Sequence, residues 1–180
     1  MKKLTYVFLL AFIGLTIASC SNKGMKVITN EEAETDLSDY STYAWISDVE
    51  NIPNAYALIG PYETLVFNNR SSQKMIKESV ELQMKAKGFA LDNSDPDMLI
   101  NFTVLEEDTE FGPRSNSIEM VPVEAGTVII NLIDSKSGTQ IWQGYASGAL
   151  NPDDIKNMSS VETKVGAIFE EFDFSQFETE

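Results

Sequence analysis

The sequence contains no histidine and a single cysteine, and basic residues are scarce. Histidine is the commonest general acid–base group and metal ligand, so its absence excludes Ser-His-Asp and Cys-His catalysis and ordinary zinc sites. The lone thiol, Cys20, excludes an internal disulfide, so packing must stabilise the fold. With 13 Lys and Arg against 28 Asp and Glu, the net charge is −15, and nucleic acid is not expected as a partner.

Residues 1–19 have the form of a bacterial lipoprotein signal peptide. Two lysines precede an apolar run that is shorter than the about 20 residues of a transmembrane helix. The run ends in Ile17, Ala18 and Ser19, directly before Cys20, and this sequence resembles a lipobox. The resemblance implies cleavage before Cys20 and acylation of its sulfur and new amine. Two or three acyl chains hold a protein firmly at a membrane. An uncleaved N-terminal anchor is the alternative.

The residues after Cys20 predict the destination. In the enteric sorting rule an aspartate at this position retains a lipoprotein at the inner membrane, and the residue here is Ser21. Residues 21–24 also lack the acidic cluster of surface-exported lipoproteins. We therefore expect a lipid anchor in the outer membrane, with the protein facing the periplasm. Residues 20–36 are polar and acidic, which predicts a flexible tether.

A single α+β domain is predicted over residues 37–174, with a frayed tail over 175–180. The predicted order is β-α-β-β-β-α. We expect a mainly antiparallel four-stranded sheet with two helices packed on one face. Residues 106–125 are interpreted as a mobile excursion. The predicted elements are strands at 40–47, 98–105, 127–133 and 139–150, a helix ending at Lys87, and a helix that includes the stripe from Val161 to Phe172.

Sequence patterns also predict helix ends and faces. Gly88 stands where a left-handed C-cap is expected, and Ser159 begins a capping-box pattern. Ile129 and Ile133 should point away from the helices, and Trp142 could join them. The first helix carries an uneven apolar stripe, made of Met75, Ile76, Val80, Leu82 and Ala86.

Three segments resemble one known family. They are Asp39–Trp45, then Lys87–Phe89 followed by Asp95–Ile100, and Gly126–Ala146 with its Ile141-Trp142-Gln143-Gly144 run. The chain resembles lipoproteins of the family called domain of unknown function 4136 over roughly residues 36–172. It departs from the family pattern at Tyr43, where phenylalanine is usual, and at Gln143, where a basic residue is frequent. The resemblance implies a fold and a location, but no activity.

Carboxylates offer the only cation-binding patterns. Asp92, Asp95 and Asp97 could supply oxygen ligands to calcium, but their spacing is not that of an EF-hand. A turn, in which Asp side chains bond their own backbone, is the favoured interpretation. The acidic run over 106–110 is interpreted as a solvated loop. No metal or other cofactor is expected.

Trp45 could form part of a ligand platform together with Trp142, but sheet core is the favoured interpretation for both. We therefore expect a non-enzymatic envelope assembly protein or accessory subunit, bound to the membrane through Cys20 and to an envelope protein partner. The alternatives are a periplasmic binding module for a small apolar ligand or lipid and, less favoured, a carboxylate-based enzyme.

Overall fold

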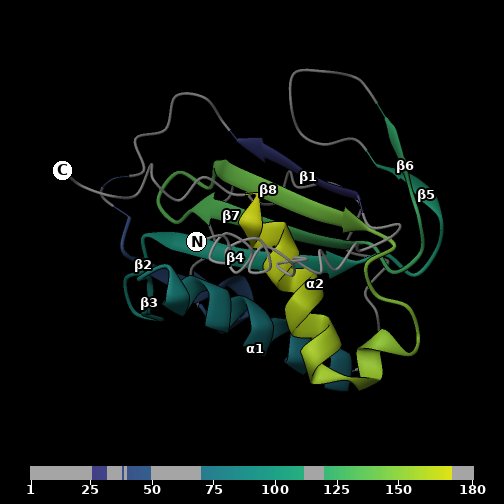
Figure 1. Ribbon diagram of the computed structural model, residues 1–180. Helices are drawn as coiled ribbons and strands as arrows, with labels where there is room; N and C mark the ends of the chain where they lie inside the picture. The colour runs from purple at the N-terminus through teal and green to yellow at the C-terminus, as the bar shows by residue number, and fades with distance from the viewer. Residues whose placement is uncertain (1–25, 32–37, 39, 50–69, 112–119, 172–180) are drawn as a thin grey trace, which may run out of the picture.

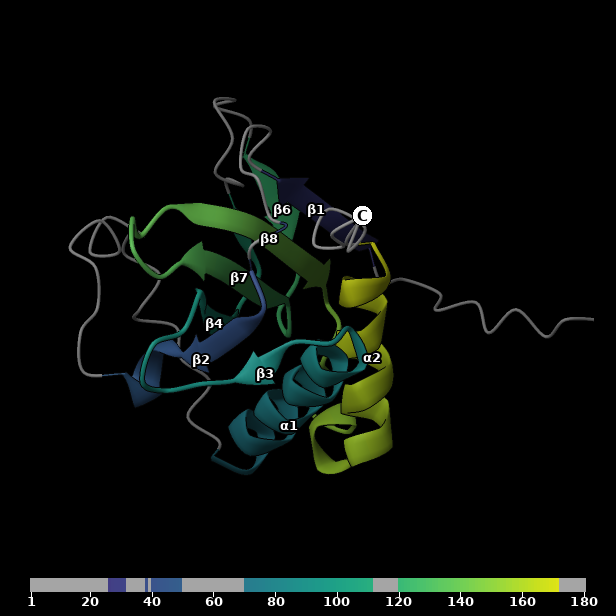
Figure 2. The ribbon, with the colours of Figure 1, turned by 90° about the vertical axis from the view of Figure 1, so that its left-hand side faces the viewer.

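The computed structural model describes residues 26–31, 38, 40–49, 70–111 and 120–171. Two helices cover one face of a mixed six-stranded sheet, and a two-stranded hairpin extends from one end of it (Figure 1). The helices are α1 (Arg70–Ala86) and α2 (Met158–Glu170), which contact each other along the same face (Figure 2). The sheet order is β1 (Lys26–Glu31), β8 (Gln140–Ser147), β7 (Val128–Asp134), β4 (Met98–Val104), β2 (Thr42–Trp45) and β3 (Ala90–Leu91).

The α+β class and the two helices on one face are confirmed, but the sheet is larger than the predicted four strands. β1, β8, β7 and β4 pair antiparallel, whereas β2 pairs in parallel with both β4 and β3. The parallel pairing follows from the connection through α1, because two parallel strands need a crossover long enough to return the chain.

Strand β1 lies inside the segment for which the sequence predicts a flexible tether. Its six residues pair with β8 from Lys26 opposite Ser147 to Glu31 opposite Trp142. Val27, Ile28 and Thr29 are β-branched, and such residues favour strands. The acidic residues near them in the sequence led to the prediction of a flexible tether instead of a strand. The folded domain therefore begins about ten residues earlier than residue 37.

The excursion predicted over 106–125 contains a hairpin. β5 (Thr109–Phe111) pairs antiparallel with β6 (Val121–Val123), and the residues between them, 112–119, lie outside the described residues. Prolines and glycines in the segment point to a loop, but short edge strands tolerate proline, and Pro122 lies within β6.

Helix α1 ends as predicted. Gly88 has φ of 93°, its N–H donates to the Lys85 carbonyl, and the Phe89 N–H donates to the Met84 carbonyl at 3.0 Å. These two bonds define a Schellman motif. Its buried stripe differs from the prediction: Ile76, Val80 and Met84 are buried, together with two serines, whereas Leu82 is 52% exposed.

Helix α2 begins earlier than the capping-box pattern indicates. Its N-cap is Asn157, whose side chain accepts from the Ser159 N–H, so Ser159 lies inside the helix. Just before this cap, the chain forms the 3₁₀ turn η4 (Asp154–Lys156). The apolar stripe is confirmed at Val161, Val165, Ile168 and Phe169, and Phe172 lies outside the described residues.

The main core lies between the sheet and the helices. Alternate residues of β2, β4 and β7, together with Ile141, Trp142 and Ala146 of β8, point into it, and they meet the buried stripes of α1 and α2. On the opposite face, two smaller apolar clusters form: Leu105, Val123, Ile129 and Tyr145 at one end, and Ala44, Leu99 and Ile133 at the other. The outward orientation predicted for Ile129 and Ile133 is confirmed.

Candidate functional site

The predicted lipidation site, Cys20, lies outside the described residues, as do the lipobox residues Ile17, Ala18 and Ser19. The first described residue after them is Lys26, where β1 begins. Within the described part of the chain, no helix is both long and apolar enough to cross a bilayer. The anchor therefore rests on the sequence pattern alone.

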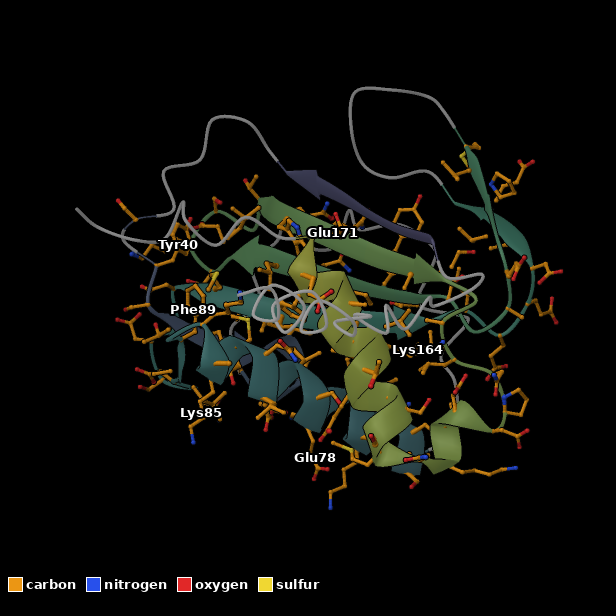
Figure 3. All side chains as sticks on the ribbon, viewed as in Figure 1. Tyr40, Glu78, Lys85, Phe89, Lys164 and Glu171 are labelled. Carbon is orange, nitrogen blue, oxygen red and sulfur yellow. The ribbon has the colours of Figure 1, made fainter. Side chains whose placement is uncertain are left out.

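The three segments that resemble the known family meet at one end of the sheet. Tyr40 donates from its hydroxyl to Asp134 Oδ2 at 2.6 Å. One residue further, Ser41 begins the contacts with Asp97, and the Ser135 N–H donates to the Asp97 carbonyl. Burial, followed by the hydrogen bond to Asp134, raises the pKa of Tyr40 above its ordinary value. Figure 3 labels Tyr40 near the start of β2.

Asp97 is the centre of this junction. Its Oδ2 accepts the backbone N–H groups of Ser41 and Thr42, each at 2.9 Å, and both their hydroxyls. Partial burial raises the pKa of Asp97, but these four hydrogen bonds outweigh burial, and the pKa lies below its usual range. The carboxylate thus fixes the start of β2 against the start of β4.

The Asp92 carboxylate is used in the same way. Its Oδ1 accepts from the N–H and hydroxyl of Ser94 and from the Asp95 N–H. The Ser94 hydroxyl, followed by these two N–H groups, lowers the pKa of Asp92. The turn interpretation is confirmed for Asp92, which bonds the backbone of its own turn, whereas Asp97 bonds the distant backbone of Ser41 and Thr42.

The acidic run after β4 is exposed. Glu106, Glu107 and Asp108 lie on the surface, and Asp108 Oδ1 accepts from the Ala125 N–H at 2.8 Å. Glu110 lies within β5. No cluster of three or more potential metal ligands occurs among the residues that the structure describes. This hydrogen bond joins Asp108, just before β5, to Ala125, just after β6, and so closes the base of the β5–β6 hairpin.

Both tryptophans belong to the main core, as the favoured interpretation predicts. Trp45 donates from Nε1 to Glu81 Oε1 at 2.9 Å, and Lys77 Nζ lies 5.1 Å from its ring centroid. Trp142 is fully buried on the helix-facing side, where its ring centroid lies 5.6 Å from that of Phe169. The suggestion that Trp142 points away from the helices is therefore wrong. A β-bulge at the β7–β8 pair, between Leu132 and the next residue, shifts the alternation of β8.

A row of amide side chains crosses the sheet on the face away from the helices. We call Asn101, Asn131 and Gln143 the amide row. They lie directly opposite one another on β4, β7 and β8, and Asn30 of β1 pairs with Gln143 at the edge. The row lies between the two apolar clusters of this face, since Asn131 stands between Ile129 and Ile133 on β7.

Two of the three amides in the row are buried, and the row is only partly satisfied. Asn131 and Gln143 are each 4% exposed, and Gln143 Nε2 donates to Asn131 Oδ1 at 2.7 Å. Gln143 Oε1 has no hydrogen-bond partner among the described residues. A buried acceptor without a partner costs about 1–3 kcal/mol. The row supplies hydrogen-bonding groups but no nucleophile or base, so its chemistry is that of binding or of fixing strand register.

These features define a small α+β domain with two helices on one face of a mixed sheet and a hydrogen-bonded junction of three sequence motifs at one end. The chain belongs to the family described as a domain of unknown function (DUF4136), whose model matches residues 27–172. The match begins within β1, so the family domain includes this strand. Among curated proteins, no significant match is found.

One solved structure shows the same fold, and two others are less similar. A DUF4136 family protein from Bacteroides thetaiotaomicron has a TM-score of 0.55 and 15% identity, covering 85% of this chain and 97% of that one. A PDZ domain protein from Parabacteroides distasonis has a TM-score of 0.48 and 19% identity, covering 81% of this chain and 35% of that one. A PelC dodecamer subunit from Paraburkholderia phytofirmans has a TM-score of 0.45 and 12% identity, covering 81% and 94%. At 15% identity the likeness to the first of these concerns the fold alone.

Proposed function

We propose that the protein is a lipid-anchored accessory or assembly subunit of the cell envelope, held at the outer membrane through Cys20 and facing the periplasm. The observation that carries the proposal is the lipobox pattern ending at Cys20, followed after only a few residues by the first strand of the domain. Two or three acyl chains on one residue suffice for stable anchoring.

The available side-chain chemistry supports a binding role rather than catalysis. The chain has no histidine, and acylation would occupy its only thiol. Asp92, Asp97 and Asp134 each accept hydrogen bonds from neighbouring backbone groups, which fixes them as structural caps. The amide row can hydrogen-bond but cannot act as a general base.

The anchor is tested by mass spectrometry of the N-terminal peptide and by membrane fractionation. The expected result is a diacylated or triacylated Cys20 in the outer-membrane fraction. The Cys20→Ser variant should lose the lipid and leave the membrane fraction while keeping the same circular dichroism spectrum. A wild-type chain that retains residues 1–19 and an unmodified thiol would contradict the proposal.

The partner is tested by crosslinking in intact cells. An envelope protein should be crosslinked reproducibly to the wild-type chain and lost with Cys20→Ser, since that variant keeps the domain but not its location. The absence of any reproducible envelope partner would count against an accessory role.

A binding module for a small apolar ligand remains the second candidate. Its expected place, between the helices and the sheet, is occupied in the described structure by large buried side chains that include Trp142, Phe169 and Met84. This packing favours the first proposal. Native mass spectrometry of protein purified from its host would reverse the preference if a bound lipid were retained.

A further inference from the structure

We infer that the domain meets the lipid surface with one defined end of its sheet: the end at which β1 begins, β8 finishes and the β5–β6 hairpin extends. We call it the hairpin end. The opposite end, with the β7–β8 turn and the Asp97 junction, faces away from the bilayer. The inference rests on the proposed lipid anchor at Cys20 and adds the orientation that this anchor imposes.

The pairing of β1 fixes where the tether leaves the domain. β1 runs antiparallel to β8 along its full length, so Lys26 lies opposite Ser147, the last residue of β8. The Ser147 hydroxyl accepts from the Glu124 N–H at 3.1 Å, directly after β6. Figure 1 shows the start of β1 on the same side of the molecule as β5 and β6. The point of attachment is therefore a corner of the sheet at the hairpin end.

The tether is too short to allow free choice of orientation. Six residue steps separate Cys20 from Lys26. Even fully extended at about 3.3–3.6 Å for each residue, they span only about 20 Å. β7 alone, with seven residues at about 3.3 Å each, is about as long as this tether. Turning the opposite end toward the bilayer would therefore require the tether to run back along the whole sheet.

Negative charge at the hairpin end should prevent the domain from inserting into the lipid surface. Glu106, Glu107, Asp108 and Glu124 are exposed there. Carboxylates are repelled by anionic headgroups within a Debye length, about 10 Å at 0.1 M salt. The acyl chains on Cys20 thus hold the protein, and the hairpin end faces the headgroups across a short gap.

Two exposed positions at opposite ends of β7 test the orientation. Ala125 precedes β7 at the hairpin end, and Lys136 lies in the β7–β8 turn. Because acylation removes the native thiol, Ala125→Cys and Lys136→Cys each provide one site for a fluorescent donor. The full lipidated chain is placed in vesicles of phosphatidylethanolamine and phosphatidylglycerol that contain a headgroup-labelled acceptor. Energy transfer should be at least about twofold higher from Ala125→Cys, because a strand length of about 20 Å separates the two sites.

A lengthened tether is the matched control. Inserting 20 Gly and Ser residues after Ser21 adds a root-mean-square reach of about 25 Å, so the difference between the two sites should shrink. Equal transfer from a chain of natural length, or higher transfer from Lys136→Cys, would overturn the orientation alone. A difference that persists with the long tether would show that surface contact, not the tether, sets it, which also overturns the inference. A chain that carries no lipid overturns both the anchor and the orientation.

Discussion

The sharpest stability prediction concerns Gly144, in the middle of β8 under the helices. A Cβ added at this position would lie 2.4 Å from Trp142 Cη2, 2.5 Å from Trp142 Cζ2 and 2.7 Å from Ile168 Cγ2. Both neighbours are fully buried. The backbone of Gly144 is not among those with positive φ, so an alanine would meet only this steric conflict. The substitution Gly144→Ala therefore isolates packing from backbone strain.

The expected cost can be estimated from two opposing effects. Overpacking a filled core costs about 1–3 kcal/mol, and three contacts below 3.0 Å, two against the buried Trp142 indole and one against Ile168, place this site at the upper end. Removing a glycine from a strand interior returns about 0.5–1 kcal/mol of chain entropy. The free energy of unfolding of Gly144→Ala should therefore fall by about 2 kcal/mol. For a chain of this size, the Tm should fall by about 4–8 °C.

Urea unfolding followed by far-ultraviolet circular dichroism measures the change, and Gly166→Ala is the matched control. Gly166 lies inside α2, and an added Cβ would meet only the flexible end of Gln83, at 3.3 Å from Nε2. Alanine is favoured over glycine in a helix interior by about 0.8–1 kcal/mol. The same substitution should thus stabilise the protein at this position and destabilise it at Gly144.

A double-mutant cycle identifies the cause. Trp142→Phe removes the two indole atoms nearest to the added Cβ, so Gly144→Ala should cost less in that background, with a coupling of about 1 kcal/mol. If Gly144→Ala is as stable as the wild type, or if the two substitutions are additive, the packing described around Trp142 is wrong.

The remaining predictions concern hydrogen bonds, and all are measured by chemical or acid unfolding. Asn131→Leu should lower the free energy of unfolding by about 1–3 kcal/mol, because Gln143 Nε2 loses this acceptor. Adding Gln143→Leu should cost less than the sum of the two single substitutions, because it removes the unpaired amide, and strict additivity would count against their bond. The folded-state pKa of Asp97 lies below the reference of 3.8, so its stabilisation is present above about pH 4 and lost as pH falls through the folded pKa. In the Asp97→Asn variant, the free energy of unfolding should therefore change less as the pH falls. If its pH dependence equals that of the wild type, Asp97 does not contribute to acid unfolding. Asn157→Ala should lower the free energy of unfolding by about 1 kcal/mol, and Ser159→Ala should leave it almost unchanged. The reverse order would show that Ser159 is the N-cap, as the capping-box pattern predicts.

The central strands and both helices could be predicted because each carries a strong local pattern. β4 has an apolar residue at every second position from Met98 to Val104, and Gly88 ends α1 with a residue that tolerates positive φ. β1 was missed because an edge strand needs little hydrophobicity. The parallel pairing of β2 with β4 was also missed, since alternation within a strand does not record the direction of its neighbour.

The amide row could not be predicted for a related reason. A polar residue alternating with apolar ones in a strand normally indicates a solvent-facing position, and Asn101 and Asn131 fit that rule. Only the register of β4, β7 and β8 brings the amides into line, with Asn131 and Gln143 buried, and register is a property of the folded sheet. The Asp92 carboxylate was easier, because the Asx-turn pattern is local, whereas the bonds from Ser41 and Thr42 to Asp97 join residues far apart in the sequence.

The position of β1 also has a mechanical consequence. Any force transmitted from a membrane anchor at Cys20 must pass through β1 before it reaches the rest of the domain, because β1 is the first described strand after that residue. Tension applied at Lys26 toward the bilayer would pull β1 along its own axis, so that it slides past its partner residue Ser147 on β8. The six-residue β1–β8 ladder would then be loaded in shear, with its hydrogen bonds sharing the load instead of opening one after another. The edge strand β1 would thus act as the mechanical clamp of the anchored protein.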